Sequence, residues 1–409
     1  MRIIHTSDWH LGKTLDLAKN SRLEEQEEFL RELCDIADNE AIDMIIIAGD
    51  IYDNGNPQAK AEKLFYKYIK ILSQGGNRPI LVIAGNHDNP ERLIAAAPLA
   101  EEQGVIIIGT PKDQVPKGSY GVCQVVDSGE GFIEIELKGE RAVIVTLPYP
   151  SEKRLNEVFD TTHDDDKRRE SYSEKIQDIL GELSLKYRDD TINLMISHLY
   201  VNGGEKSDSE RSIELGGTLA VFPTALPEKA QYIALGHLHR PQRIGGAKTK
   251  VYYSGSPIQY SKSEIGYSKS IYEVELKSKM EPQVKSIYLK NYKPIEVWKF
   301  SSIEAALEKC KENSERNCWV YIEIETEEFI SQEHIKELNS YKKDIVEIRP
   351  IIKGQDEELN EVEVLEEKSM GELFREYYKA QRGVDISEEL ESLFLSIVEE
   401  DEEGELDET

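Results

Sequence analysis

Aspartate, histidine and asparagine recur in five short strings within the first 240 residues of the chain. The strings are Asp8-Trp9-His10, Gly49-Asp50-Ile51-Tyr52-Asp53, Gly85-Asn86-His87-Asp88, Ser197-His198 and Gly236-His237-Leu238-His239. Carboxylate, imidazole and amide groups are ligands of divalent metal ions, and pairs of such ions catalyse the hydrolysis of phosphate esters. Together the strings therefore predict a two-metal phosphoesterase site.

Each string alone is weak evidence for such a site. An Asp-x-His sequence is common, and a lone histidine on a strand is more often a packed core residue than a ligand. Five of the eight histidines fall within the strings, however, and the strings follow apolar runs that a sheet could bring together at one edge. The three other histidines, His5, His163 and His334, are interpreted as structural or surface residues.

The apolar runs between the strings predict the elements that must position them. Short runs at 44–48 and 80–84 alternate with segments of helical periodicity, the first from about Arg22, which indicates repeated strand–helix–strand units. Asn56-Pro57 is expected to start a helix, with asparagine as its cap. Further strands are expected at 122–135, 142–147, 192–196, 232–235, 250–254 and 270–276. The last two should complete a second sheet, so the predicted fold is an α/β sandwich flanked by helices.

The content and order of these strings resemble the calcineurin-like metallophosphoesterase superfamily. Within it they look like the nuclease subunits of bacterial SbcCD complexes, the counterparts of the archaeal and eukaryotic Mre-eleven nucleases. The narrower resemblance also rests on the opening sequence at 3–12, on Tyr253-Ser254-Gly255-Ser256-Pro257 and on the sequence at 373–378. It covers nearly the whole chain and is strongest to about residue 275.

The resemblance implies a role for each candidate site residue. Asp50, whose carboxylate can bridge two cations, would hold both ions. One ion would also bind Asp8, His10 and His239, and the other Asn86, His198 and His237. His87 would protonate the leaving oxygen or stabilise the transition state. Asp53 resembles the carboxylate that orients this histidine in related phosphatases. The mixed nitrogen and oxygen ligands suit Mn²⁺, which the family uses, although Fe²⁺, Zn²⁺ or Co²⁺ are conceivable.

The chain is long enough for more than one domain. We expect a nuclease domain at 1–276, a small α+β domain at 282–353 and an acidic linker at 354–368. The resemblance implies that the small domain caps the nuclease domain and contacts DNA. A helical hairpin should follow at 369–398, before a disordered acidic tail at 399–409. The resemblance implies that the hairpin docks on an SMC-like ATPase of the SbcC type. Packing of the hairpin on its own domain is the alternative.

Composition limits the classes of function. The formal net charge of −29, more than half of it beyond Leu276, speaks against a broad basic surface for nucleic acid, so DNA binding depends on the resemblance. The four cysteines lack metal-binding or redox spacing and are expected to be reduced thiols. No signal peptide or membrane span is expected. We therefore predict a soluble, cytoplasmic, nucleoid-associated protein.

The function expected is that of a metal-dependent DNA nuclease. The resemblance implies a 3'-to-5' exonuclease on duplex ends and an endonuclease on single strands and hairpins, acting in recombination, replication and repair. It also implies a homodimer within a heterotetramer. The helix at 58–72 is a candidate interface, and packing of this helix on its own sheet is the alternative. The alternatives are a phosphatase or small-molecule phosphodiesterase with the same metal core, and a scaffold that has lost its metals. The scaffold is disfavoured because every expected ligand is present.

Overall fold

The computed structural model describes residues 1–15, 20–155, 165–210, 220–326, 330–352, 374–375 and 390. The chain forms two compact units. The first comprises Met1–Glu210 and Leu219–Pro294, and the described part of the second runs mainly from Ile295 to Ile352.

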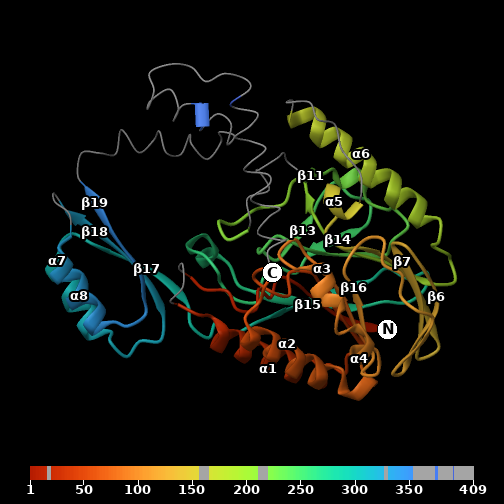
Figure 1. Cartoon of the computed structure of the whole chain (residues 1–409), viewed down its shortest axis with the longest axis horizontal. Helices are drawn as coiled ribbons and strands as arrows, with labels where there is room; N and C mark the ends of the chain where they lie inside the picture. The colour runs from red at the N-terminus through yellow and green to blue at the C-terminus, as the bar shows by residue number, and fades with distance from the viewer. Residues whose placement is uncertain are drawn as a thin grey trace. The chain divides into compact units, whose positions relative to one another are not determined.

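A six-stranded sheet carries the first three strings of the predicted site (Figure 1). Its order is β16-β15-β1-β2-β3-β4, in which β1 to β4 run parallel and β15 and β16 run antiparallel to their neighbours. The strands are β1 (Arg2–Thr6), β2 (Met44–Ala48), β3 (Ile80–Ile83), β4 (Val105–Ile108), β15 (Ser270–Glu275) and β16 (Gln283–Tyr288). The strands β2, β3 and β4 have continuous apolar sequences, as expected of parallel strands that are buried on both faces.

An eight-stranded sheet carries the last two strings. Its order is β13-β14-β12-β9-β8-β7-β6-β5, with a parallel centre formed by β8, β9, β12 and β14. The strands are β5 (Gly118–Tyr120), β6 (Cys123–Gly129), β7 (Phe132–Leu137), β8 (Glu140–Leu147), β9 (Ile192–His198), β12 (Tyr232–Gly236), β13 (Gln242–Ile244) and β14 (Lys250–Tyr253). A short parallel pair joins β10 (Tyr200–Val201) to β11 (Ala220–Val221).

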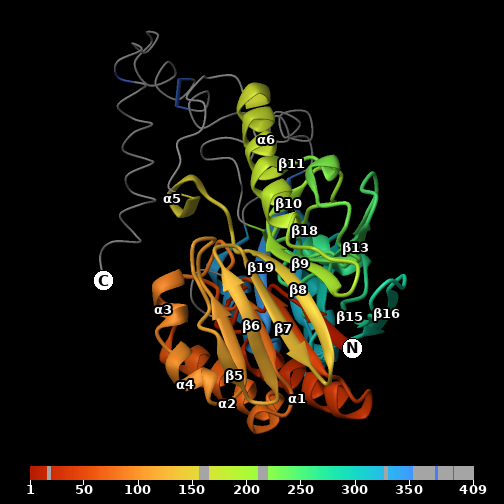
Figure 2. The ribbon, with the colours of Figure 1, turned by 90° about the vertical axis from the view of Figure 1, so that its right-hand side faces the viewer.

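Helices cover the outer faces of the two sheets, which gives four layers (Figure 2). On the six-stranded sheet, α1 (Leu23–Asn39) and α2 (Ala59–Leu72) share one apolar core with β2. On the eight-stranded sheet, α6 (Asp165–Ser184) buries Tyr172, Ile176 and Leu180. A third apolar core lies between the sheets. The short helices are α3 (Pro90–Ile94), α4 (Ala97–Glu101), α5 (Glu152–Leu155), η1 (Gln74–Gly76), η2 (Pro223–Ala225) and η3 (Lys262–Gly266).

The second unit is a small α+β module. A parallel sheet of order β17-β18-β19 packs against α7 and α8 around buried Val320, Ile322 and Leu338. Its elements are β17 (Ile295–Phe300), α7 (Ile303–Glu312), β18 (Trp319–Thr326), α8 (Gln332–Tyr341) and β19 (Ile345–Ile352). Serines cap both helices, since Ser302 accepts from the N–H of Ala305 and Ser331 from that of His334.

The α/β sandwich predicted from the sequence is confirmed, with corrections to its strands. The apolar run at 270–276 was expected in the second sheet, but β15 pairs antiparallel with β1 in the first, where it covers the open edge of that strand. The strand β16 was expected in the second unit, yet it pairs with β15, so the first unit extends to Pro294. Residues 122–135 belong to a hairpin, β6 and β7, because Gly131, with a φ of 73°, allows a tight turn between them.

The start of α2 is also corrected. The N–H of Asn56 donates to the side chain of Asn54, which makes a local turn, and Gln58 keeps extended backbone angles. The helix therefore begins at Ala59, with Gln58 rather than Asn56 at its cap position.

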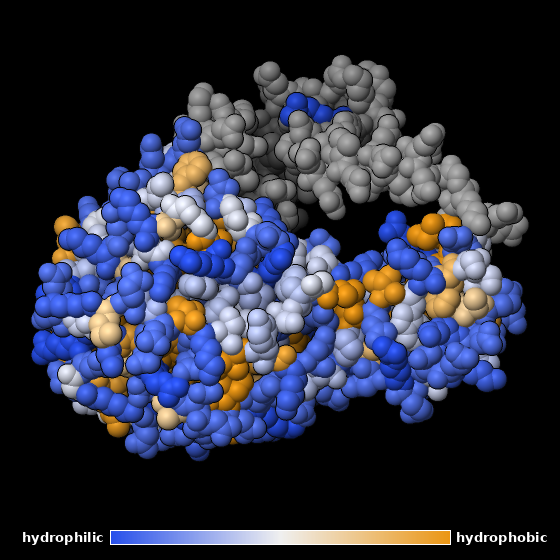
Figure 3. Space-filling view, turned by 180° about the vertical axis from the view of Figure 1, so that it is seen from behind, coloured by the Kyte–Doolittle hydropathy of each residue, from blue (hydrophilic) through white to orange (hydrophobic). Residues whose placement is uncertain are grey.

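Several expectations fall outside the described residues. The acidic linker, the helical hairpin apart from three of its residues, the acidic tail and His163 are among them. Within the described part of the chain, no helix combines the length and apolar character needed to cross a bilayer. On the face drawn in Figure 3, hydrophilic side chains dominate, and apolar side chains form small patches between them.

Candidate metal centre

The five strings converge at the carboxyl ends of five parallel strands, drawn from both sheets. The residues concerned are Asp8 and His10 after β1, Asp50 after β2, Asn86 and His87 after β3, His198 at the end of β9, and His237 and His239 after β12. Because parallel strands end at the same edge of a sheet, the topology brings these side chains together.

Glycines allow these strand ends to approach one another closely. A Cβ atom at Gly85 would lie 2.1 Å from Oδ1 of Asp50, and one at Gly236 would lie 1.9 Å from the carbonyl oxygen of Ala48. No other residue type fits at such distances. The glycines of the Gly-Asn-His-Asp and Gly-His-Leu-His strings are thus explained by packing between neighbouring strands.

Four of the site residues have a left-handed backbone. The φ angles are 54° at Asp8, 44° at His10, 52° at Asp50 and 105° at His237. Such conformations cost roughly 1–3 kcal/mol each and occur where surrounding structure enforces them. Here backbone hydrogen bonds do so, since the N–H of Asp8 donates to the carbonyl of Gly49 and that of His10 to the carbonyl of Asp50, both at 3.0 Å. The strained backbone angles are therefore part of what orients these side chains toward the centre of the site.

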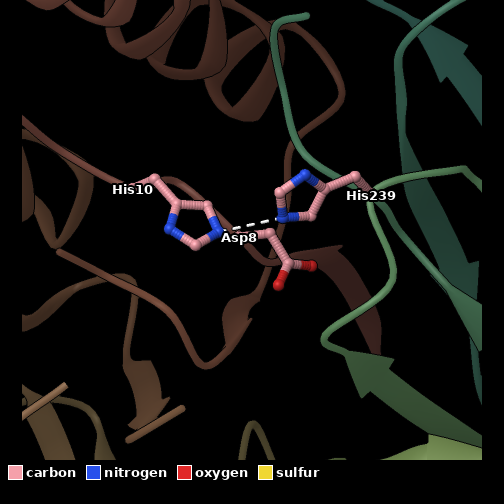
Figure 4. A group of neighbouring side chains, drawn as sticks. All are labelled: Asp8, His10 and His239. Atoms are coloured by element: carbon pink, nitrogen blue, oxygen red, sulfur yellow. Dashed lines mark hydrogen bonds between the residues drawn. The ribbon is translucent and has the colours of Figure 1, made fainter. Parts of the chain in front are cut away.

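Asp8, His10 and His239, which we call the first donor set, are buried and point toward one another (Figure 4). The two Nε2 atoms of His10 and His239 lie 3.0 Å apart. Their ligand atoms and that of Asp8 all lie within 4.8 Å of one another. Two adjacent ligands on a divalent ion, each about 2.1 Å from it at a right angle, are separated by about 3 Å. The first donor set therefore has a spacing that fits a metal ion.

Asn86, His198 and His237, the second donor set, have the same spacing. Oδ1 of Asn86 lies 2.9 Å from Nε2 of His198 and 3.0 Å from Nδ1 of His237. Between the two sets lies Asp50, whose Oδ2 is 3.5 Å from Nε2 of His10 and 3.3 Å from Nε2 of His198. Asp50 is thus the residue that both sets share.

The fit to metal ions is supported by the chemistry of the two donor sets, which gather carboxylate, amide and imidazole ligand atoms in one buried place. Such a donor set suits divalent ions of intermediate hardness. The cluster therefore indicates divalent metal binding.

Burial and neighbouring charges shift the protonation of these residues. Burial raises the pKa of Asp8 to about 6 and lowers the pKa values of His10 and His237 well below the usual range. Burial also opposes charge on Asp50 and His198, but their mutual attraction and the other nearby charges and hydrogen bonds together outweigh burial. These interactions hold the pKa of Asp50 well below its usual range and raise the pKa of His198 to about 9. His10 and His237 are therefore neutral, the form in which imidazole binds a metal ion, whereas His198 would release a proton on binding one.

His87 lies beside the donor sets, with its ring centre 4.6 Å from that of His10. Its orientation differs from the expectation that the carboxylate of Asp53 holds it. Nδ1 of His87 is 2.6 Å from the backbone carbonyl of Asp53, whereas the Asp53 carboxylate pairs with Lys13 at 2.9 Å. A carbonyl oxygen only accepts, so Nδ1 of His87 carries the proton. Asp53 orients His87 through its main chain.

The turn that carries Asn86 and His87 is held from two sides. The Asp88 carboxylate accepts hydrogen bonds from the backbone N–H groups of Ile51, Tyr52 and Gly85, which fixes the turn. Arg154 donates to the carbonyls of Gly85 and Asp88 at 2.8 and 2.7 Å. Sequence reasoning missed Arg154, because it lies in a charged helical segment with nothing to distinguish it.

Two further residues were missed behind His239. Glu264 and Lys269 form a buried ion pair next to this histidine. The Tyr253–Pro257 sequence, part of the resemblance, signals this region, since Ser256 also contacts Lys269.

The interpretation of His5 as a structural residue is confirmed. It is buried, and its ring nitrogens lie 2.8 Å from the Tyr232 hydroxyl and 3.1 Å from the Leu235 carbonyl.

Comparison with known proteins finds matches along most of the chain. A profile described as Calcineurin-like phosphoesterase matches residues 1–241, and one described as Type 5 capsule protein repressor C-terminal domain matches residues 291–382. The first match includes all five strings, and it agrees with the divalent metal binding that the cluster indicates.

Curated relatives extend over a similar range. The chain is 41% identical to the SbcD subunit of the SbcCD nuclease of Bacillus subtilis over 97% of either protein. It is 32% identical to the protein of that name from Escherichia coli K12, over 81% of this chain and 79% of the relative. Among solved structures, a dimetal phosphatase from Danio rerio aligns with 70% of this chain and 98% of its own at 12% identity. Its TM-score of 0.36 is too low to add to the argument.

Proposed function

Because the chain belongs to the calcineurin-like phosphoesterases and, within them, to the family of SbcD nucleases, we propose that it hydrolyses phosphodiester bonds in DNA with two metal ions. It is a hydrolytic nuclease subunit. Its substrates are duplex ends, cut in the 3'-to-5' direction, and single strands and hairpins, cut internally.

The observation that carries this proposal is the position of Asp50 between two donor sets. One carboxylate oxygen lies within 3.5 Å of a histidine from each set. A carboxylate shared by two clusters of carboxylate, amide and imidazole ligands is the arrangement that a pair of divalent ions requires. We assign one ion to Asp8, His10, His239 and Asp50, and the other to Asn86, His198, His237 and Asp50. Both are Mn²⁺.

The roles of the chain's own residues follow from their positions. When bound, two divalent ions neutralise charge on the phosphoryl oxygens and lower the pKa of water. Asn86 supplies an oxygen without a charge, so the centre keeps its positive character. Nδ1 of His87 donates a hydrogen bond to the Asp53 carbonyl. Proton transfer to the leaving oxygen therefore uses the other ring nitrogen, Nε2. Arg154 and Asp88 keep the turn that carries Asn86 and His87 in place.

The remaining parts of the proposal concern assembly. The chain acts with an SMC-like ATPase of the SbcC type, which binds the hairpin at 369–398, and it pairs as a homodimer within a heterotetramer. The names of the relatives, which describe one subunit of an SbcCD nuclease, support a complex of this kind. The complex works at the nucleoid in the cytoplasm, in recombination, replication and repair.

The test is cleavage of an end-labelled DNA duplex by the purified chain with Mn²⁺, beside a generic phosphodiester substrate. The proposal predicts that both are cleaved, and that Asp50→Asn abolishes both activities. If the chain hydrolyses only the small ester, and still does not cleave DNA after the ATPase partner is added, a small-molecule phosphodiesterase or phosphatase would be favoured. Activity retained in Asp50→Asn would contradict the site assignment.

A further inference from the structure

His239 makes contacts through both of its ring nitrogens. Nε2 faces His10 across the first donor set, while Nδ1 lies 2.6 Å from the hydroxyl oxygen of Ser209. The Ser209 hydroxyl in turn donates to the carboxylate of Glu264, so it accepts from Nδ1–H of His239. Glu264 is also directly within reach, with Oε1 at 3.5 Å from Nδ1. The network thus places the proton on Nδ1 and leaves the lone pair of Nε2 facing the donor set.

Glu264 is a carboxylate with no exposed surface. Its charge is balanced by Lys269, which is only 6% exposed. The three protons of the Lys269 ammonium group meet three acceptors, namely the Glu264 carboxylate, the Ser256 hydroxyl at 2.7 Å and the His239 carbonyl at 2.9 Å. Lys269 therefore fixes both the Glu264 carboxylate and the backbone of His239.

A buried ion pair of this kind is weak evidence for stability alone. Removing two charges from water is costly, and apolar replacements of similar volume are often as stable. The pair is therefore better explained by its contact with His239 than by its contribution to folding.

Other histidines of the two sets are supported differently. Nδ1 of His198 contacts a neutral backbone carbonyl, that of Ala48, at 2.8 Å. Nδ1 of His10 has no hydrogen-bond partner in the described part of the chain, and the nearest carboxylate oxygen, on Asp53, lies 3.8 Å away and pairs with Lys13. Of these three described histidines, His239 alone has a buried carboxylate linked to its outer nitrogen by a hydrogen-bond relay.

We infer that Glu264, acting through Ser209 and neutralised by Lys269, is a positioning residue that holds His239 with its Nε2 lone pair toward the first donor set, and thereby strengthens metal binding at that set only. The inference rests on the proposed function, since it concerns one of the two metal ions assigned there. Partners of this type behind a metal-bound histidine typically change metal affinity by about 10- to 100-fold.

The test measures metal affinity rather than turnover. The metal-free full-length protein is titrated with Mn²⁺, and the free ion is followed by its electron paramagnetic resonance signal, which resolves the two binding steps. Glu264→Gln removes the charge and keeps the shape of the side chain. A second variant, Glu264→Gln with Lys269→Met, removes both charges, so that no unpaired ammonium group stays buried. The matched control is Glu134→Gln, which removes the charge of another buried carboxylate, on β7 of the eight-stranded sheet, that pairs with the more exposed Arg188 at 2.7 Å.

The inference predicts that both Glu264 variants weaken one Mn²⁺ site by about 10-fold or more and leave the other within about twofold. The control should bind both ions as the wild type does. Wild-type affinity at both sites in either Glu264 variant, or equal weakening of both sites in the double variant, would overturn the inference and leave the proposed function intact. A wild-type protein that binds no Mn²⁺ would overturn the proposed function itself.

Discussion

At the scale of single residues, the chemistry of the site depends on which ring nitrogen of each histidine already forms a hydrogen bond. His87 uses Nδ1 on the Asp53 carbonyl, and His239 uses Nδ1 on Ser209. The residue types and their order in the chain were predictable from the sequence. The hydrogen-bond partner of each ring nitrogen was not predictable, because it lies on loops such as 207–210 and 262–266 that contact the strings only in the folded chain.

A first prediction separates His87 from the metal ligands. His87→Ala should lower turnover by about 10²-fold or more, because it removes the proton donor, while the Mn²⁺ content per chain stays unchanged. Steady-state cleavage assays and metal analysis by mass spectrometry measure the two quantities. Loss of metal in this variant would show that His87 is a ligand instead.

Asp53→Asn provides the contrasting case. The backbone carbonyl that holds His87 survives this change, so turnover should fall far less than in His87→Ala. A loss as large as that of His87→Ala would mean that the Asp53 carboxylate takes part directly, as related phosphatases suggest.

At the scale of elements, the site exists because strand ends from two sheets meet with almost no space between them. The apolar runs predicted most strands of both sheets correctly. They did not predict the sheet that β15 joins or the unit that β16 belongs to, because an apolar run looks the same whichever sheet edge it covers. Likewise, the sequence alone does not show why the strings contain glycines, because the close packing that excludes a Cβ atom arises only between neighbouring strands.

Gly85→Ala tests this packing. The added methyl group would overlap Oδ1 of Asp50, so the variant should lose Mn²⁺ affinity at both sites and unfold at a lower temperature. Gly181→Ala is the matched control, since a Cβ there meets nothing within 4 Å in α6 and should add about 1 kcal/mol of stability. Isothermal titration and thermal melts provide the measurements. Normal metal binding in Gly85→Ala would refute the packing argument.

At the scale of the whole molecule, all predicted metal ligands lie in the first unit, and its boundary follows Pro294. A fragment of residues 1–294 should therefore fold cooperatively and bind two Mn²⁺ ions. A fragment of residues 1–278 lacks β16 and should melt at a lower temperature, because β15 then becomes an exposed edge. Equal melting temperatures, measured by circular dichroism, would place the boundary near residue 276, as the sequence alone suggested.

The net charge of −29 also acts on the whole molecule. An acidic protein attracts the DNA backbone poorly, so the isolated chain should bind duplex DNA weakly at about 0.15 M salt and lose affinity further as salt increases. Fluorescence anisotropy with a labelled duplex measures this dependence. Tight binding of the isolated chain at that salt concentration would contradict the expectation and point to a strong local basic surface.

The most direct test of the central claim is an anomalous-scattering measurement at the manganese edge on crystals grown with Mn²⁺. We expect two anomalous peaks on either side of the Asp50 carboxylate, one within reach of Asp8, His10 and His239 and the other within reach of Asn86, His198 and His237. The absence of both peaks, or peaks held by other residues, would contradict the two-metal centre on which the proposed nuclease activity depends.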